Sequence, residues 1–147
     1  MKKHIVPFLF LVLAGNANAQ TEKSDPSAGA VISFASLEHD YGTIANGANG
    51  ECEFTYTNTG TGYLIISSCK SSCGCVVPKC DPNPLAPGRS AVVKVKYDTN
   101  RSGPFTKTVT VESNATNTPI VVLRIKGHVL PPPAEAIPAD TNTEPVR

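Results

Sequence analysis

Apolar and polar residues alternate with a period of two along most of the central part of this 147-residue chain. The clearest run is 51–57, where Cys52, Phe54 and Tyr56 are separated by glutamate and threonine. Similar runs lie at 31–36, 90–97, 108–112 and 121–126, and 63–67 is a short apolar run that we also expect to form a strand. Successive side chains of a β-strand point to opposite faces, so this period predicts strands with one buried face.

Short turn motifs separate these runs. Asn46-Gly47, Asn49-Gly50 and Pro87-Gly88 are examples, and residues of these types favour tight turns. No long segment with a helical period lies between the runs, whereas parallel strands need a long crossover connection. The sequence therefore predicts an all-β domain over 31–129, an immunoglobulin-like sandwich of about seven strands in two antiparallel sheets. An open barrel of similar strands is the alternative.

The first nineteen residues have the composition of an export signal. Lys2 and Lys3 form a basic start, an apolar run follows, and Ala17-Asn18-Ala19 places small residues where a signal peptidase cleaves. The apolar run is about ten residues, shorter than the roughly twenty that span a bilayer. We therefore expect 1–19 to be a signal peptide, and the mature chain to be exported to the periplasm or cell surface without an inserted segment.

The segments that flank the predicted domain are polar or rich in proline. Residues 20–30 predict a flexible lead-in, and 130–147, which hold five of the 13 prolines, predict a disordered tail. The chain has 13 basic and 12 acidic residues, so loss of Lys2 and Lys3 leaves 11 against 12, a net charge of −1. No basic block is present, so nucleic acid is not an expected partner.

Several short motifs resemble a family of bacterial exported domains. They are His39-Asp40-Tyr41-Gly42-Thr43-Ile44, Phe54-Thr55-Tyr56-Thr57-Asn58-Thr59-Gly60, Ser72-Cys73-Gly74-Cys75, Ala86-Pro87-Gly88, Ser113-Asn114 and Ile125-Lys126-Gly127-His128-Val129. In this order and spacing they make residues 32–129 similar to the domain of unknown function family 1573, which is related to the Hydin-like immunoglobulin-type domains. The resemblance implies an exported immunoglobulin-like sandwich and no particular reaction. Cys52, Cys69 and Cys80 are additions to the paired cysteines of that family.

Five cysteines are the residues best suited to chemistry. Cys52 occupies an inward strand position, and Cys69, Cys73, Cys75 and Cys80 form a cluster. In an exported chain, these residues favour disulfides. Cys69 and Cys80 could close a loop without unusual geometry. Cys73 and Cys75 on an extended strand would have Cβ atoms roughly 6–7 Å apart, against roughly 4 Å in a disulfide, so this pair can join only where the chain bends between them. The pairing stays open.

Two other kinds of chemistry fit the same cluster. The four thiolates could bind zinc or Cu(I), although Gly74 alone separates the Cys69/Cys73 pair from the Cys75/Cys80 pair. Thiol–disulfide exchange is the other possibility, although a redox site usually presents Cys-x-x-Cys at the start of a helix, and no helix is predicted here.

The remaining candidates carry no recognised chemistry. We expect His39 in a hydrogen-bonded turn and His128 on the solvated face of the last strand. No nucleophile elbow, zinc-protease motif or phosphate-binding loop occurs, so no catalytic or cofactor-binding residue is predicted. The first hypothesis is a non-catalytic module that binds a protein or glycan of the cell envelope, or has a structural role there, with 67–87 as the candidate surface. The alternative is metal binding or disulfide exchange at the cysteine cluster.

Overall fold

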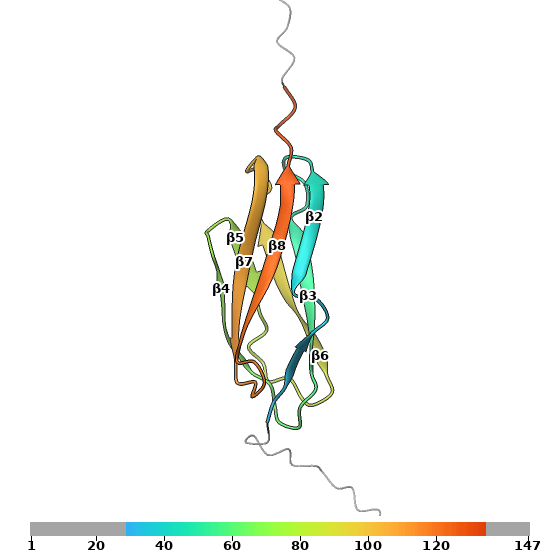
Figure 1. Ribbon diagram of the computed structural model, residues 1–147, viewed down its shortest axis with the longest axis vertical. Helices are drawn as coiled ribbons and strands as arrows, with labels where there is room; N and C mark the ends of the chain where they lie inside the picture. Colours follow the sequence, from blue (N-terminus) through green and yellow to red (C-terminus); the bar gives the residue numbers. More distant parts are fainter. Residues whose placement is uncertain (1–28, 135–147) are drawn as a thin grey trace, which may run out of the picture.

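A computed structural model describes residues 29–134, which form eight β-strands and no helix. The strands are β1 (Ile32–Phe34), β2 (Glu38–Ile44), β3 (Glu51–Asn58), β4 (Ile66–Ser71), β5 (Val76–Lys79), β6 (Ser90–Tyr97), β7 (Gly103–Ser113) and β8 (Ile120–Val129). Figure 1 shows them as an elongated sandwich, in which the described chain starts at the lower end and leaves at the upper end. The predicted signal peptide and most of the predicted lead-in and tail lie outside the described residues.

Two sheets of four strands make up the sandwich. One has the order β1-β3-β6-β5 and the other β2-β8-β7-β4. This confirms the immunoglobulin-like sandwich predicted from the sequence, with one difference in strand direction. Strand β2 pairs in parallel with β8, so the prediction of two purely antiparallel sheets is wrong. The parallel pair is possible because β2 and β8 are far apart in sequence, and the chain between them, which forms β3 to β7, supplies the long connection that parallel strands need.

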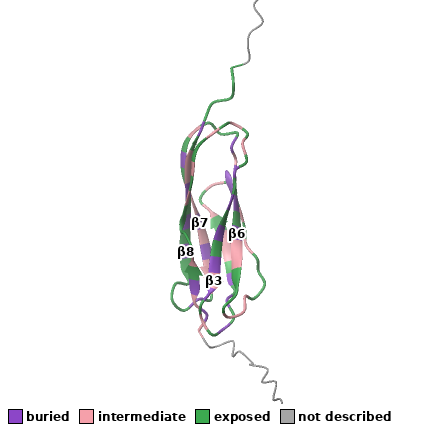
Figure 2. Ribbon diagram, turned by 90° about the vertical axis from the view of Figure 1, so that its right-hand side faces the viewer, coloured by how far each residue is buried: buried purple, intermediate pink, exposed green. Residues whose placement is uncertain are grey.

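The core lies where the alternating runs were predicted. Phe54 of β3 pairs with Val93 of β6, and both side chains are buried, as are Val95 and Tyr97 further along β6. The outward residues of the same pair of strands carry charge, with Lys94 Nζ 3.4 Å from a carboxylate oxygen of Glu53. Buried residues line the space between the two sheets in Figure 2. The period of two therefore placed this register correctly.

Three strand predictions need correction. The strand predicted at 63–67 is displaced to β4, and Leu64 makes only an isolated bridge to Leu85. His39 lies inside β2 instead of in a turn, with its ring 4.5 Å from that of Tyr41. Strand β5 lies within the segment that showed no regular alternation. The two strands that the sequence did not predict, β2 and β5, are at sheet edges. One or both faces of an edge strand remain exposed, and its hydrophobic pattern is therefore weaker.

A buried asparagine fastens the lower end of the sandwich. Asn58 is fully buried, and its amide nitrogen donates to the carbonyls of Gly62 and Leu85 at 2.8 and 2.9 Å. Its side-chain oxygen accepts the N–H of Gly60 at 3.0 Å. A buried carboxamide is stable only when its donors and acceptor are paired, so these bonds hold the loop between β3 and β4 in one conformation.

Candidate functional site: a disulfide-clamped edge

The Cys69–Cys80 disulfide joins the two sheets at one edge of the sandwich. Cys69 is on β4, the edge strand of one sheet, and Cys80 directly follows β5, the edge strand of the other. Their Cα atoms are 6.4 Å apart, within the range of unstrained disulfides. The bridge holds together two edge strands that share no backbone pairing. We call β4, β5 and this bridge the clamped edge.

A second disulfide, Cys73–Cys75, lies at the tip of the turn that connects β4 to β5, with its Cα atoms 5.3 Å apart. The chain bends at Gly74, which is the condition that the sequence set for this pairing. Hydrogen bonds also hold the tip: Ser71 Oγ donates to Cys73 O at 2.7 Å, and Asp98 N–H donates to Cys75 O at 2.9 Å. The tip is therefore held by contacts that do not depend on the bridge.

Cys52 is the free cysteine of the described residues and is separate from the cluster. It is buried on the inward face of β3, beside Tyr41. Burial raises the pKa of the Cys52 thiol, and also that of the Tyr41 hydroxyl, which donates to Gly50 O at 2.7 Å. A protonated, buried thiol is a poor nucleophile and a poor metal ligand, so Cys52 is a packing residue.

The structure does not bring the four clustered cysteines together as one metal site. It places them in two pairs, one in the turn between β4 and β5 and one between β4 and the residue after β5. Within residues 29–134, no three or more His, Cys, Asp or Glu side chains converge as a ligand set. The metal hypothesis thus lacks the geometry it needs, whereas the exchange hypothesis keeps a candidate in Cys73–Cys75.

Three depressions of about 330, 340 and 430 Å³ surround the clamped edge, and Lys79 of β5 lines all of them. The first lies between β4 and the segment after β5, and its wall includes Ile66, the Cys69–Cys80 bridge and Pro82. This first depression thus has apolar side chains and the bridge in its wall and an exposed lysine at its rim, whereas the second is lined mainly by charged side chains of β3, β5 and β6. Residues 29–134 give Lys79 no ion-pair partner.

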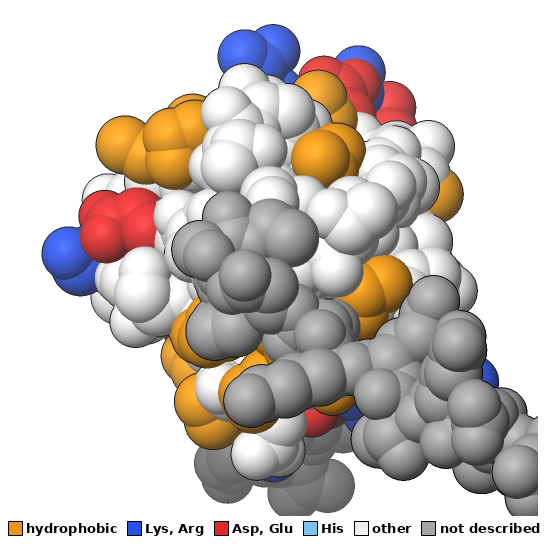
Figure 3. Space-filling view, turned by 90° about the horizontal axis from the view of Figure 1, so that it is seen from below, with side chains coloured by type: hydrophobic (Ala, Val, Ile, Leu, Met, Phe, Trp, Pro, Cys, Tyr) orange, Lys and Arg blue, Asp and Glu red, His pale blue; other side chains and the backbone are white. Residues whose placement is uncertain are grey.

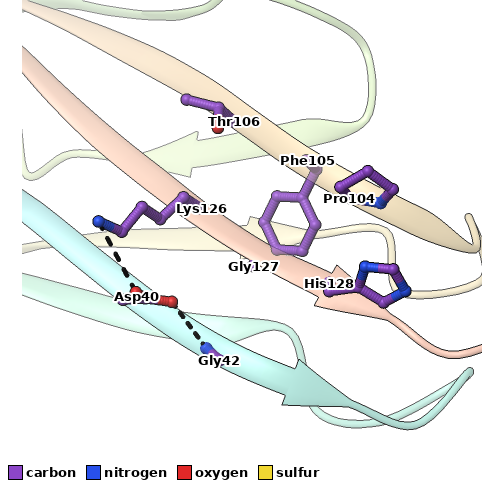
Figure 4. A pocket seen from close by; sticks show the side chains of 8 residues that line it. All are labelled: Asp40, Gly42, Pro104, Phe105, Thr106, Lys126, Gly127 and His128. Atoms are coloured by element: carbon purple, nitrogen blue, oxygen red, sulfur yellow. Dashed lines mark hydrogen bonds and ion pairs between the residues drawn. The ribbon is translucent and has the colours of Figure 1, made fainter.

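A fourth depression, of about 410 Å³, lies on the outer face of β2, β8 and β7 (Figure 4). Its cation, Lys126, already contacts Glu38 at 2.6 Å and Asp40 at 3.7 Å. These carboxylates, mainly Glu38, raise the pKa of Lys126. His128 is exposed at the end of β8, as the sequence predicted. Because its charges are mutually paired, this site is a weaker candidate for a ligand than the clamped edge.

The lower end of the molecule offers apolar side chains in scattered positions. In Figure 3, where this end faces the viewer, they are separated by polar surface on the part not covered by grey atoms. Tyr63, Ile65 and Ile120 are among the exposed apolar residues of the described chain. Single exposed apolar residues are common on soluble domains, so we assign no site to them.

Sequence reasoning missed the polar side chains that act on the sheet edges. Asn117 donates to Ile32 O and accepts from Ile32 N–H, at 2.9 and 3.0 Å, and so occupies the edge of β1. These two residues are 85 positions apart. An isolated asparagine in a predicted turn gives no sign of such a distant partner, so no local pattern could have revealed this contact.

The fold defines a class: an immunoglobulin-like β-sandwich. It resembles the ASH / PapD-like domain 7 of human CEP192, with a TM-score of 0.57, 11% identity, and coverage of 88% of this chain and 99% of that one. The chain belongs to the DUF1573 family of proteins of unknown function, whose model matches residues 32–129. No curated protein matches the sequence.

Two further solved structures share the fold within longer chains. A protein of unknown function from Porphyromonas gingivalis W83 has a TM-score of 0.62 and 16% identity, over 74% of this chain and 51% of that one. The Vibrio cholerae VesB protease has a TM-score of 0.55 and 18% identity, over 66% of this chain and 31% of that one. This chain therefore spans about half or less of these two proteins, and at such identities the likeness concerns the fold alone.

Proposed function

We propose that this protein is an exported, non-catalytic β-sandwich module that binds a protein of the cell envelope through its clamped edge. The observation that carries the proposal is the Cys69–Cys80 disulfide, which fixes two edge strands of opposite sheets relative to each other. Disulfides persist in oxidising compartments, and the basic and apolar start of the sequence supports export. No helix among residues 29–134 is long and apolar enough to cross a membrane.

A rigid, exposed edge suits recognition. Binding loses less free energy to ordering when the surface is already held in one conformation, and the two disulfides hold β4, β5 and the turn between them. The depressions beside β4 and β5 can receive side chains, and sheet edges provide backbone groups for a protein partner. A glycan would gain less from such an edge, because it has no peptide backbone to pair with it.

In-cell photo-crosslinking tests the proposal. A photo-reactive residue placed at exposed Ser67 of β4 should give a protein adduct, whereas one at exposed Ser33 of β1, the matched control on the opposite edge, should give at least several-fold less. The isolated mature chain should begin at Gln20. Equal adduct at both positions, no adduct at either, or an adduct with carbohydrate alone would contradict the proposal.

Disulfide exchange at Cys73–Cys75 is a second candidate function, favoured by one observation. The bridge encloses a single residue, its Cys73 is partly exposed whereas Cys75 is buried, and the hydrogen bonds of the tip would hold both sulfurs in place after reduction. A thiolate of a partner dithiol would attack Cys73 Sγ, and Cys75 would leave as a thiolate and take up a proton. The second partner thiol would then release Cys73, so two electrons and two protons pass from the dithiol, which becomes a disulfide.

Limiting dithiothreitol, itself a dithiol, tests this candidate. Alkylation and mass mapping should show Cys73 and Cys75 reduced before Cys69 and Cys80, with the domain still folded and its melting temperature lowered by less than after reduction of Cys69–Cys80. Simultaneous reduction of both bridges, or resistance of Cys73–Cys75 until the domain unfolds, would exclude the exchange function.

A further inference from the structure

The four edge strands of the sandwich differ in whether their outward backbone groups are already paired. At the β1 edge, Asn117 bonds both backbone groups of Ile32. At the β2 edge, Ser36 Oγ bonds both backbone groups of Glu38, at 2.8 and 3.3 Å. Glu38 and Ile32 thus cannot pair with another strand without losing these bonds.

Strand β5 is closed in a different way. Asp98 N–H donates to Cys75 O, and strict alternation along the β5–β6 pair then turns the backbone groups of Val76 and Pro78 toward the free edge. Pro78 has no N–H to donate, and Val76 N–H already donates to Cys73 O at 3.4 Å. Proline at an edge is a common means of preventing strand addition.

Strand β4 is open by the same reasoning. Ser72 N–H donates to Thr108 O at 2.9 Å, so alternation along the β4–β7 pair turns the backbone groups of Cys69 and Ser71 toward the free edge. Within residues 29–134, neither N–H has a hydrogen-bond partner at that edge. Two successive open positions are the minimum that an added strand needs for regular pairing. On β1 only Phe34 remains open beyond Ile32, and on β2 the register shift between Asp40 and Thr43 interrupts the regular alternation.

We propose that β4 accepts an extended, acidic segment of another protein as a fifth strand of its sheet. This inference rests on the proposed function and names the kind of partner at the same edge. The added strand would receive hydrogen bonds from Cys69 N–H and Ser71 N–H. Its inward side chain would lie in the depression of about 330 Å³ walled by Ile66 and the Cys69–Cys80 bridge, which favours an apolar residue.

Charge selects the occupant. Lys70 lies between the two open positions with its side chain exposed, and Lys79 is exposed at the rim of the same depression. A second copy of this chain, paired antiparallel about Lys70, would place two lysines directly opposite each other, which is unfavourable across strands. An acidic side chain at that position is attracted to Lys70, whose nearest carboxylate, on Glu112, is 3.8 Å away and exposed.

A proline substitution distinguishes strand pairing from docking by side chains alone. Ser71→Pro removes one open N–H and places a ring in the path of the added strand, while the ladder bonds to β7 remain. Ser71→Ala is the matched control, since it loses the same hydroxyl and keeps the N–H. With the photo-reactive residue at Ser67, we expect Ser71→Pro to lower the adduct at least tenfold and Ser71→Ala to keep it within about twofold. Lys70→Glu should also lower it, by several-fold.

The outcomes separate the two proposals. An adduct that persists in Ser71→Pro shows that the edge docks a partner without strand pairing, which overturns this inference and leaves the proposed function standing. No adduct with the parent chain overturns both. Should Ser71→Pro fail to fold, hydrogen exchange of the wild-type adduct decides: Cys69 and Ser71 amides must become protected, and unchanged exchange there overturns strand addition. An adduct whose partner is a second copy of this chain also overturns it.

Discussion

The two flanks of the sandwich hold the two sheets together in different ways. At the β1–β2 flank, the chain itself passes between the sheets, and hydrogen bonds hold it: Arg124 N–H donates to Leu37 O, and Thr116 N–H donates to Ala30 O, both at 2.8 Å. At the clamped edge, the Cys69–Cys80 disulfide takes that role. Covalent closure leaves the outward backbone groups of β4 free, whereas hydrogen-bonded closure occupies those of Ile32 and Glu38. The disulfide therefore gives both a fixed edge and an open one.

The largest effect should come from the bridge between the sheets. Replacing Cys69 and Cys80 together by Ser should lower the free energy of unfolding by about 3 kcal/mol, because the bridge closes a loop with a sequence separation of 11. Chemical denaturation with and without reductant measures it. A loss of unfolding free energy below about 1 kcal/mol would mean that contacts other than the Cys69–Cys80 bridge hold this flank together.

The tip bridge should matter less. Replacing Cys73 and Cys75 by Ser should cost about 1.5 kcal/mol at most, since a loop with a sequence separation of 2 restricts the unfolded chain less. The same denaturation experiment compares the two variants directly. A larger loss at the tip than at Cys69–Cys80 would reverse the roles assigned to the bridges.

The stability of the β1–β2 flank should depend on the side-chain amide of Asn117 and not on a disulfide. Asn117→Ala removes two part-buried hydrogen bonds to Ile32 and should cost about 1 kcal/mol, because Asn117 itself is exposed and water can replace part of what it contributes. Asn117→Asp is a useful companion, since it keeps the acceptor and loses the donor. Its free energy of unfolding should lie between those of the wild type and the alanine variant. An equal loss for the aspartate and alanine variants would show that the donor carries the whole effect.

High pH should also lower the stability of the flank that contains Tyr41. Near neutral pH this effect should be the smallest of those described. Burial raises the pKa values of Cys52, Tyr41 and Tyr97 above their ordinary values of 9.0 for the thiol and 10.0 for the hydroxyls. A raised pKa in the folded state gives stability that is complete below the unfolded value and is lost as pH rises through the folded one. The melting temperature should thus show no loss from these groups up to about pH 9 and fall above it. Cys52→Ala should delay the onset, and an identical onset would assign it elsewhere.

The sequence predicted the interior strands and missed the properties of the edges. Strands β3 and β6 were found because a buried face leaves a local period of two, as at Phe54 and Val93. Strand β2 has no fully buried residue, and its partner β8 is far along the chain, so neither its existence nor its parallel direction had a local sign.

The candidate site could be predicted only in its composition. The four cysteines of the clamped edge were identified, and the requirement that the chain bend at Gly74 was correct. Which backbone groups face outward depends on the pairing of β4 with β7 and of β5 with β6, and hence on contacts between segments distant in sequence. The open edge of β4 is therefore a property of the folded molecule.

Native-state hydrogen exchange of single edge amides tests the central claim, that one flank is closed and the other open. In the free protein, we expect the amides of Cys69 and Ser71 to exchange at nearly the rate of an unprotected peptide. The amides of Lys70, paired with β7, and of Ile32, bonded to Asn117, should be protected by orders of magnitude. Protection of Ser71 equal to that of Lys70, or rapid exchange at Ile32, would contradict the account.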